Sequence, residues 1–482
     1  MTTQRPPRLV CAGCGTVVPP EEPYPFRCPL ALGRDDIDHV VTRELDPAGL
    51  AFPTGDHPHP FIRYRAMLAS YQMARAGGVT DRVFIDWVGE LDRRIAAVAG
   101  HGFRTTPFEP HAALSARLGL GADDALWIKD ETGQVAGSHK ARHLMGIALH
   151  LEVAERLGKT TREETARRGL AIASCGNAAL AAATLARATG RRLAVFIPTD
   201  ADARVVARLE ELGADITVCA RGEGVAGDPC YLAFHRAMAA QALPFCCQGS
   251  DNGLTIEGGS TLVWEMVSVL TQESKSLDRL FVQVGGGALA SACVQGLREA
   301  RALGAIAGMP RIHAVQTQGA WPLRRAYERV RARILNRMGR SAPSGHTSPL
   351  EDESLAEWIR TRADRFEVTD ELRYARTHRS QFMWPWEQTP LSIAHGILDD
   401  ETYDGFAILD GMIASGGYPV TVSEERLAEA NTLARAVAHS RADATGTAGL
   451  AGLLELRAHD LPPAGTSVAV LFTGGAHESA RL

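Results

Sequence analysis

The sequence predicts an α/β protein that contains two open parallel sheets. Between residues 170 and 248, short apolar runs alternate with helical stretches, and a second series of apolar runs begins at residue 280. Strands that alternate with helices of this length form βαβ units, whose strands pair in parallel. The chain also contains 47 glycines in 482 residues, which suits the many turns that join such strands to helices.

The first series accounts for one sheet. Its apolar runs are residues 170–173, 193–197, 216–219 and 244–247. The helical stretches that separate them are residues 178–189, 203–212 and 230–242. Runs of this length, bounded by turn residues, are typical of buried strands.

The second series accounts for the other sheet. Residues 280–284 and 312–315 flank a helical stretch at 288–303, and residues 467–472 form a last strand far along the chain. The segment in between must therefore contain an insertion and helices that pack on this sheet. Residues 335–390, rich in Arg, Ser, Pro and Trp, are predicted to be a long irregular excursion that covers an active site or a subunit contact.

The chain is too long for a single ordinary core, so we expect two or three domains. A ribbon-like segment occupies residues 1–55, and a smaller α/β domain occupies residues 166–249. A larger domain combines residues 56–165 and 250–482, with an insertion at 320–400.

Composition and charge exclude several classes of protein. Hydrophobic residues make up 45% and charged residues 22%, as in globular proteins. A net charge of −5 provides no basic surface for nucleic acid. The most apolar window, 169–188, has Gly176 and Asn177 at its middle, which indicates a strand, turn and helix and not a membrane span. Residues 1–7 lack the apolar stretch of a signal peptide, so we expect a cytoplasmic protein with nine reduced cysteines.

Three cysteines near the N-terminus match half of a zinc ribbon. Cys11 and Cys14 form a Cys-x-x-Cys pair, and Cys28 follows. A structural zinc site needs four nitrogen or sulfur ligands in a tetrahedron. His39 or an acidic side chain could complete the set. The segment could also hold its shape without a metal, and this is the interpretation that we favour.

Lys140 is the candidate catalytic residue. It follows a strand-like run at 125–129 and a glycine-containing loop, and it begins a helical stretch at 140–155. A lysine that forms a Schiff base with a cofactor must be held beside it, and the N-terminus of a helix favours phosphate and carboxylate groups. Because most lysines are solvated surface groups, Lys140 is a candidate only together with the segments that follow.

A polar turn after the first strand of the smaller domain is the candidate substrate site. It consists of Ser174, Cys175, Gly176 and Asn177. Its N–H groups suit a substrate carboxylate, and the asparagine amide suits a phenolate oxygen. The simpler alternative, favoured when the turn is taken alone, is a helix N-cap.

A glycine turn at the second sheet is the candidate phosphate site. It consists of Gly285, Gly286, Gly287, Ala288 and Leu289, between a strand and a helix. Glycines there let backbone N–H groups surround a phosphate. The turn matches neither the dinucleotide fingerprint nor the P-loop, and a plain tight turn is the alternative.

Taken in order, a lysine, an asparagine turn, a glycine turn and a late hydroxyl, Thr473, are the parts needed to hold pyridoxal 5′-phosphate (PLP). With these motifs the chain resembles the PLP-dependent enzymes of fold type II, which include threonine synthase, serine and threonine dehydratases, cysteine synthase and the tryptophan synthase β chain. The resemblance covers roughly residues 60–482. It implies the α/β fold type II architecture, a homodimer and a small amino-acid substrate.

The resemblance also assigns roles to residues. It implies that Lys140 forms the Schiff base and that His139, which precedes it, borders the cofactor as in the tryptophan synthase β chain. Thr473 occupies the position of a Ser or Thr against the pyridine nitrogen. In the glycine turn, Ala288 replaces the family's fourth glycine, and residues 257–261 match a Glu-Gly-x-x-Thr helix start.

Threonine synthase-like proteins resemble the chain best, through the N-terminal Cys-x-x-Cys-Gly and the Gly-Thr-Ala-Gly-Leu sequence at 446–450. A neutral hydroxyl at the ring nitrogen disfavours transamination, so we expect elimination or replacement at the β- or γ-carbon of an amino acid. A racemase or a serine/threonine dehydratase on the same scaffold is the alternative. A non-catalytic binding protein is a more distant one.

Overall fold

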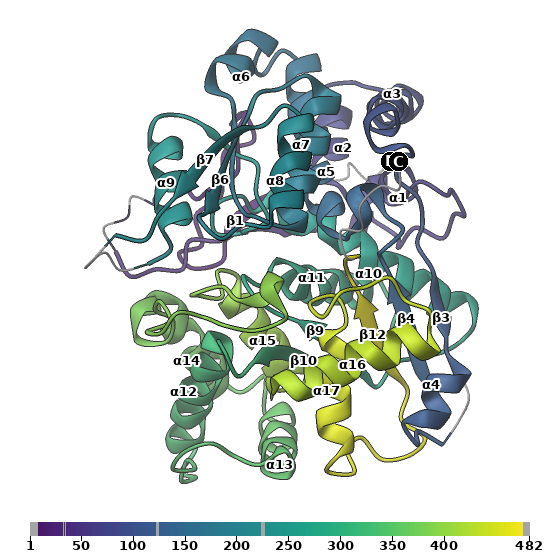
Figure 1. Ribbon diagram of the computed structural model, residues 1–482, viewed down its shortest axis with the longest axis vertical. Coiled ribbons are helices and arrows are strands. Elements are labelled where there is room, and N and C mark those ends of the chain that lie inside the picture. The colour runs from purple at the N-terminus through teal and green to yellow at the C-terminus, as the bar shows by residue number, and fades with distance from the viewer. Residues whose placement is uncertain (1–7, 32, 34, 122–124, 223–226, 476–482) are drawn as a thin grey trace.

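The computed structural model describes residues 8–31, 33, 35–121, 125–222 and 227–475. It confirms the predicted α/β class with two parallel-sheet domains. Figure 1 shows the two sheets in separate lobes, with helices α10 (Leu254–Gln272) and α11 (Ala288–Ala302) between them. Residues 1–7, for which we expect no signal peptide, lie outside the described residues. No helix in the described ranges is long and apolar enough to cross a membrane.

The larger sheet has six strands, with β12 at its interior. Their order is β11 (Val420–Val422), β10 (Arg311–Thr317), β9 (Arg279–Gln283), β12 (Val468–Phe472), β4 (Leu126–Asp130) and β3 (Phe108–Pro110). All neighbours pair in parallel except β3, which is antiparallel to β4. Because β12 pairs with both β9 and β4, the last predicted strand connects two halves of the sheet.

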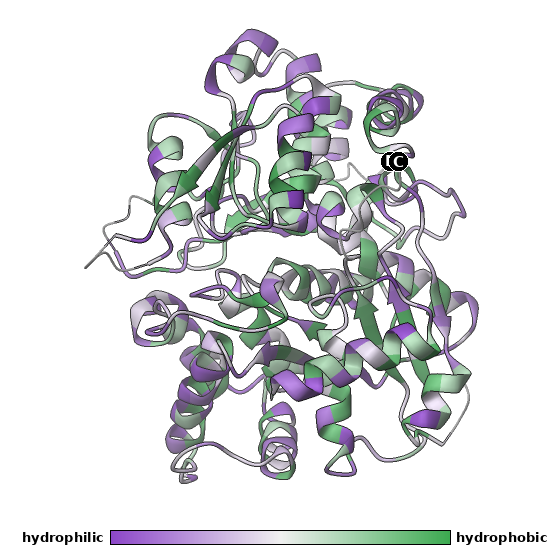
Figure 2. Ribbon diagram, viewed as in Figure 1, coloured by the Kyte–Doolittle hydropathy of each residue, from purple (hydrophilic) through white to green (hydrophobic). Residues whose placement is uncertain are grey.

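Several helices surround the larger sheet in its lobe (Figure 1). They are α4 (Ala112–Arg117), α12 (Pro322–Arg337), α13 (Pro349–Arg360), α14 (Phe366–Thr377), α15 (Gly405–Ser415), α16 (Glu424–Val437) and α17 (Ala448–Arg457). Figure 2 shows apolar residues along the strands and on the inward faces of the helices, and polar residues on the outer faces. This arrangement follows from the burial of apolar area, the main stabilising contribution to folding.

The smaller sheet has four parallel strands, in the order β7 (Asp215–Cys219), β6 (Leu193–Pro198), β5 (Leu170–Ala173) and β8 (Leu243–Pro244). The helices of this lobe are α1 (Pro60–Arg63), α2 (Ala69–Ala76), α3 (Asp81–Ala99), α5 (Lys140–Arg156), α6 (Arg162–Arg168), α7 (Asn177–Thr189), α8 (Ala203–Glu211) and α9 (Pro229–Ala239). Side chains of α3 and α5 share a hydrophobic core with this sheet.

Helix α10 contributes to both hydrophobic cores. Its residues Leu262 and Met266 pack in the core of the larger sheet. Its residues Ile256 and Trp264 pack in the core of the smaller sheet. A helix that is apolar around most of its circumference must be buried on all sides, and this explains how one element joins the two lobes.

The N-terminal segment forms a small ribbon. Strands β1 (Arg8–Cys11) and β2 (Val41–Glu44) pair in antiparallel register, so that Cys11 lies opposite Val41. Short 3₁₀ turns occur at η1 (Pro47–Gly49), η2 (Arg65–Met67), η3 (Val135–Gly137), η4 (Arg379–Gln381) and η5 (His395–Ile397).

The prediction of an irregular excursion at 335–390 is wrong, because the segment contains α13, α14 and the end of α12. Helix α13 begins with a capping box in which Ser348 and Glu351 bond each other's backbone N–H groups. Leu355 and Ile359, one turn apart, are buried on its inner face. Local capping and a spacing of four residues therefore outweighed a composition rich in Arg, Ser and Pro.

Candidate active site

Lys140 occupies the first position of α5, directly after the η3 turn. Only four of the chain's 51 basic residues are lysines. Lys129 is fully buried in an ion pair at 2.5 Å, Lys159 donates to a backbone carbonyl at the surface, and Lys275 is exposed after α10. Of these four lysines, Lys140 alone adjoins the loop that contacts the end of β12.

The loop before Lys140 pairs with the residues that follow β12. The His139 N–H group donates to the Thr473 carbonyl at 3.0 Å, and the Gly475 N–H group donates to the Gly137 carbonyl at 3.1 Å. Ser138 and Gly474 form an isolated bridge between the two segments. Lys140 and Thr473 are the first and last residues in the series of motifs predicted from the sequence. The fold thus makes them neighbours in space.

Gln283, the last residue of β9, fixes the direction of the Thr473 hydroxyl group. Its Nε2 atom donates to Thr473 Oγ1 at 2.7 Å and to the carbonyls of Gly446 and Leu471 at 2.9 and 3.2 Å. Two carbonyls can only accept, so the atom that faces all three oxygens is the amide nitrogen. Because the Thr473 oxygen accepts from Gln283, its own hydrogen is left to donate elsewhere.

The glycine turn joins β9 to α11 and presents its backbone to an anion. The buried carboxylate of Asp399 accepts a hydrogen bond from the backbone of Gly286. A Cβ atom at Gly285 would lie 2.2 Å from Asp399 Oδ2, so only glycine permits this approach. Burial raises the pKa of Asp399 to about 6. The Gly286 N–H group thus points at an oxyanion acceptor, which is the arrangement that a phosphate would require.

The asparagine turn lies against the residues that follow β12. The Nδ2 atom of Asn177 is 2.5 Å from the position that a Cβ atom would take at Gly474. Asn177 Oδ1 and Ser138 Oγ are buried and lack hydrogen-bond partners within the described residues. Such atoms are costly unless a ligand or water satisfies them, and they fit a polar cofactor.

The turn is not a simple side-chain N-cap. Gly176 is the N-cap residue of α7, and no side chain caps the helix. Ser174 Oγ instead accepts from the Gly176 N–H group at 3.4 Å, and Cys175 is exposed. The first N–H groups of the helix are therefore left for another acceptor.

Two neutral histidines border the lysine. His139 Nδ1 is 2.9 Å from the Thr473 carbonyl, and His143 Nδ1 is 2.8 Å from the Thr255 carbonyl. A carbonyl only accepts, so each Nδ1 atom carries the hydrogen. Burial, followed by the charge of Lys140, lowers the pKa of His139 well below its usual range and that of His143 to about 3.

Asp404 is a buried acid between the glycine turn and the loop at Gly249. Its Oδ2 atom accepts from the Gly249 N–H group at 3.1 Å, and a Cβ atom at Gly287 would lie 3.3 Å from its Cβ atom. Burial raises the pKa of Asp404 to about 8. The carboxyl group is therefore mostly protonated at neutral pH.

This pKa predicts how the stability of the cofactor-free protein depends on pH. The pKa of Asp404 is higher in the folded protein than in the unfolded chain, where it is about 4, so its protonation stabilises the folded state. This contribution is fully present below about pH 4 and is lost as the pH rises through about 8. Between pH 5 and pH 7 the loss from this group is about 2–3 kcal/mol. Asp404→Asn should flatten the curve of melting temperature against pH, whereas Asp86→Asn, at an exposed ion pair, should not. Parallel curves for wild type and Asp404→Asn would contradict this assignment.

A buried ion network supports the start of α5. Arg142 contacts Glu131 at 2.7 Å and Glu265 at 2.8 Å, and Lys129 contacts Glu265 at 2.5 Å. The side chains of all four are at most 1% exposed. Because Arg142 lies two residues after Lys140, the network fixes the position of the helix end that carries the lysine.

The sequence pattern misses several of these residues. Gln283 could be noticed in the sequence, because it is a polar residue that directly follows the apolar residues 280–282 of its strand. Asp399 and Asp404 leave none, because they lie in the long segment after α14 and reach the glycine turn only through the fold. The three N-terminal cysteines, by contrast, lie together and are joined by His39.

A lysine amine, a glycine turn between a strand and a helix, and a directed hydroxyl group are the features expected of an enzyme that holds a phosphorylated carbonyl cofactor. The family model described as pyridoxal-phosphate dependent enzyme matches residues 100–474. The chain belongs to this family, and the residues described above fit its cofactor.

Individual proteins are also similar to part of the chain. The chain is 32% identical over 188 residues to an L-serine dehydratase of Saccharomyces cerevisiae, a match that covers 36% of this chain and 50% of the relative. It is 30% identical over 214 residues to a serine dehydratase-like protein of Mus musculus, covering 44% and 56%. The chain thus spans about half the length of the curated relatives that it matches.

The fold is similar to that of several solved structures. A threonine deaminase of T.th. superposes with a TM-score of 0.53 and 21% identity, over 82% of this chain and 99% of that one. Maize serine racemase superposes with a TM-score of 0.52 and 20% identity, over 82% and 94%.

Proposed function

We propose that this chain catalyses PLP-dependent β-elimination from a small 2-amino acid, in the manner of a serine or threonine dehydratase. The observation that carries the proposal is the contact between Gln283 and Thr473, which leaves the Thr473 hydroxyl as a donor. A donor suits an unprotonated ring nitrogen, which stabilises negative charge at the substrate weakly, so that a leaving group is expelled quickly. The names of the curated relatives support the dehydratase alternative over the threonine synthase-like one.

Each of these residues would have its own role in the reaction. Lys140 would hold the cofactor covalently and then move the proton of the substrate α-carbon. The N–H groups from Gly285 to Leu289 would bind the phosphate, and Ser174 and Asn177 would bind the substrate carboxylate and the cofactor phenolate. Once bound, the cofactor supplies an electron sink for the α-carbon.

The charges around the asparagine turn bear on the leaving group. Asp200 and Asp228 both act electrostatically on the thiol of Cys175, and Arg221 is paired with Asp400 at 3.7 Å. This excess of carboxylates would repel a phosphate leaving group. We therefore favour a neutral β-hydroxyl group. The same carboxylates favour a β-ammonium group as the second candidate.

A panel of amino acids tests the proposal. The protein is incubated with L-serine, L-threonine, 2,3-diaminopropionate and O-phosphohomoserine, and keto acid and ammonia are measured. We expect release from one of the first three and none from O-phosphohomoserine. Release of phosphate and formation of threonine would contradict the proposal. Inversion at the α-carbon without ammonia would instead support the racemase alternative.

Exchange of Thr473 for an acid tests the role of the ring-nitrogen partner. Thr473→Asp would favour a protonated ring nitrogen, so we expect the rate of elimination to fall by about 10²-fold or more while half-transamination becomes detectable. Thr466→Asp, on the exposed loop before β12, is the matched control and should leave both rates unchanged. Rapid half-transamination by the wild type, with no leaving group lost, would overturn the assignment.

A further inference from the structure

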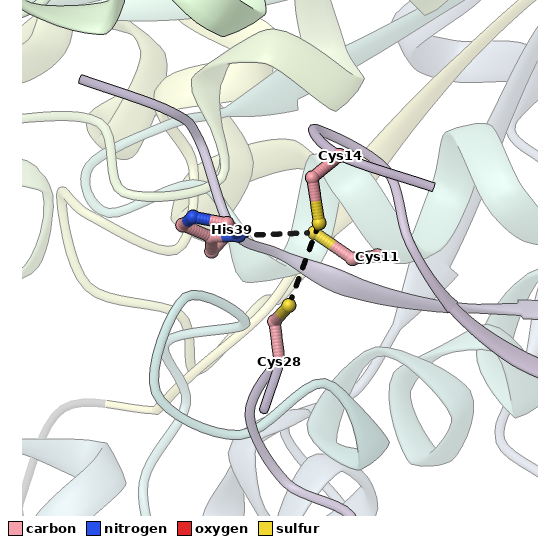
Figure 3. A group of neighbouring side chains, drawn as sticks. All are labelled: Cys11, Cys14, Cys28 and His39. Atoms are coloured by element: carbon pink, nitrogen blue, oxygen red, sulfur yellow. Dashed lines mark hydrogen bonds between the residues drawn. The ribbon is translucent and has the colours of Figure 1, made fainter. Parts of the chain in front are cut away.

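The N-terminal ribbon brings four potential metal ligands to one point. Cys11 Sγ is 3.4 Å from His39 Nδ1, and Cys14 Sγ is 3.6 Å from Cys28 Sγ. All four ligand atoms lie within 4.8 Å of one another, and Figure 3 shows them converging. The cysteines are free thiols, and 3.6 Å is far longer than a disulfide bond.

These distances match a tetrahedron around zinc. Bond lengths of about 2.3 Å to sulfur and 2.0 Å to nitrogen place two sulfur ligands about 3.8 Å apart, and a sulfur and a nitrogen about 3.5 Å apart. The observed separations of 3.6 and 3.4 Å are close to these values. Four protein ligands leave no open position, so such a site would be structural and not catalytic.

His39 is oriented for metal binding by a second group. Its Nε2 atom lies 3.1 Å from Asp35 Oδ2, and a carboxylate there keeps the hydrogen on Nε2. The other nitrogen, Nδ1, is then bare and faces Cys11 Sγ. Histidine ligands of zinc are commonly held by a carboxylate in this way. The histidine thus supplies the ligand that a fourth cysteine provides in a complete ribbon, and this fourth ligand is our reason for preferring a metal site to the metal-free segment expected from the sequence.

The backbone around the cysteines is also shaped for thiolates. The N–H groups of Gly13 and Cys14 hydrogen-bond the sulfur of Cys11, and that of Leu30 hydrogen-bonds the sulfur of Cys28. A Cβ atom at Gly13 would lie 2.4 Å from the Asp38 carbonyl oxygen. Glycine at this position therefore lets the first cysteine loop approach the segment that carries His39.

We propose that Cys11, Cys14, Cys28 and His39 bind one Zn²⁺ ion, and that this ion fixes residues 35–39 against the C-terminal end of α14 and the residues that follow it. The Asp38 N–H group donates to the Arg376 carbonyl at 2.8 Å, and the Arg379 N–H group donates to the Asp36 carbonyl at 2.8 Å. The Asp36 carboxylate accepts from the N–H and hydroxyl groups of Ser380 at 2.8 and 2.9 Å.

The residues that follow α14 also reach the glycine turn. Arg379 contacts Glu401 at 2.5 Å, and three residues beyond it Asp404 packs beside Gly287. A metal ion in the ribbon thus stabilises, through residues 376–401, the part of the chain that lies over the candidate phosphate site. Loss of the ion should loosen residues 376–401 while the two sheets remain folded.

Metal analysis of the full-length protein, purified without chelator and under reducing conditions, tests the site. We expect one zinc per chain in the wild type and in Cys219→Ser, a control at a free cysteine outside the cluster, and less than a tenth of this in Cys11→Ser. Since Cys11→Ser could impair folding, Asp35→Asn provides a second measurement. It keeps all four ligands and should weaken zinc affinity by about 10–100-fold.

Cobalt provides an independent readout. Co²⁺ added to the reduced, metal-stripped protein should give the visible absorption of a tetrahedral site with thiolate ligands. Absence of zinc in the wild type together with no such absorption would overturn the proposal. Amide exchange at residues 376–380 should rise several-fold when the metal is removed. Unchanged exchange there would show that the ion does not fix this part of the chain.

Discussion

Replacing Lys140 with alanine is expected to abolish the covalent link to the cofactor and to lower the rate of elimination by about 10²–10⁴-fold, the range for loss of a positioned proton-transfer group. Borohydride treatment of the wild type should fix the cofactor to one peptide that contains Lys140. The variant should remain folded, because Lys140 is only half-buried at the first position of α5, where alanine is a good helix former.

The small number of lysines makes this test decisive. Lys159→Ala is the matched control, since Lys159 follows the same helix and bonds only a surface carbonyl. It should retain the link and the activity. Trapping of the cofactor on Lys129, Lys159 or Lys275 in the Lys140→Ala variant would show that the assignment is wrong.

Removing Arg142 is expected to have the largest effect on stability. Arg142→Leu leaves Glu131 and Glu265 buried with Lys129 as their only remaining cation in this network. Uncompensated buried charges of this kind cost about 3–5 kcal/mol. The free energy of unfolding from urea titration measures the loss, and cofactor capture should weaken as well because Lys140 lies two residues away.

An exposed arginine provides the comparison. Arg82→Leu removes an ion pair with Asp86 at 3.2 Å, in which both side chains are more than half exposed. Such pairs contribute about 0–1 kcal/mol. Equal losses for Arg82→Leu and Arg142→Leu would contradict the role given to the buried network.

Much of the fold could be predicted from the sequence, because its sheets obey local rules. The run at 170–173 coincides with β5, and the helical stretch at 288–303 with α11 to within one residue. Short edge strands could not be predicted in this way. Strands β3 and β11, of three residues each, form because tertiary contacts supply a neighbour, and three residues carry no readable period.

The candidate site could be predicted only where a turn follows a strand. Lys140, Asn177 and Gly285 begin or precede helices, so local sequence marks them. The direction of the Thr473 hydroxyl depends on Gln283, and the burial of Asp399 and Asp404 depends on packing between segments far apart in the chain. Such contacts leave no local pattern.

The position of β12 has a consequence for synthesis on the ribosome. Until residues 468–472 emerge, β9 and β4 have no strand between them, and the larger sheet exists as two separate halves with unpaired edges. Thr473 and its contact with the loop before Lys140 arrive at the same moment. A nascent chain should therefore be unable to retain its cofactor until this strand inserts, and chains that stall earlier should expose sheet edges that chaperones recognise.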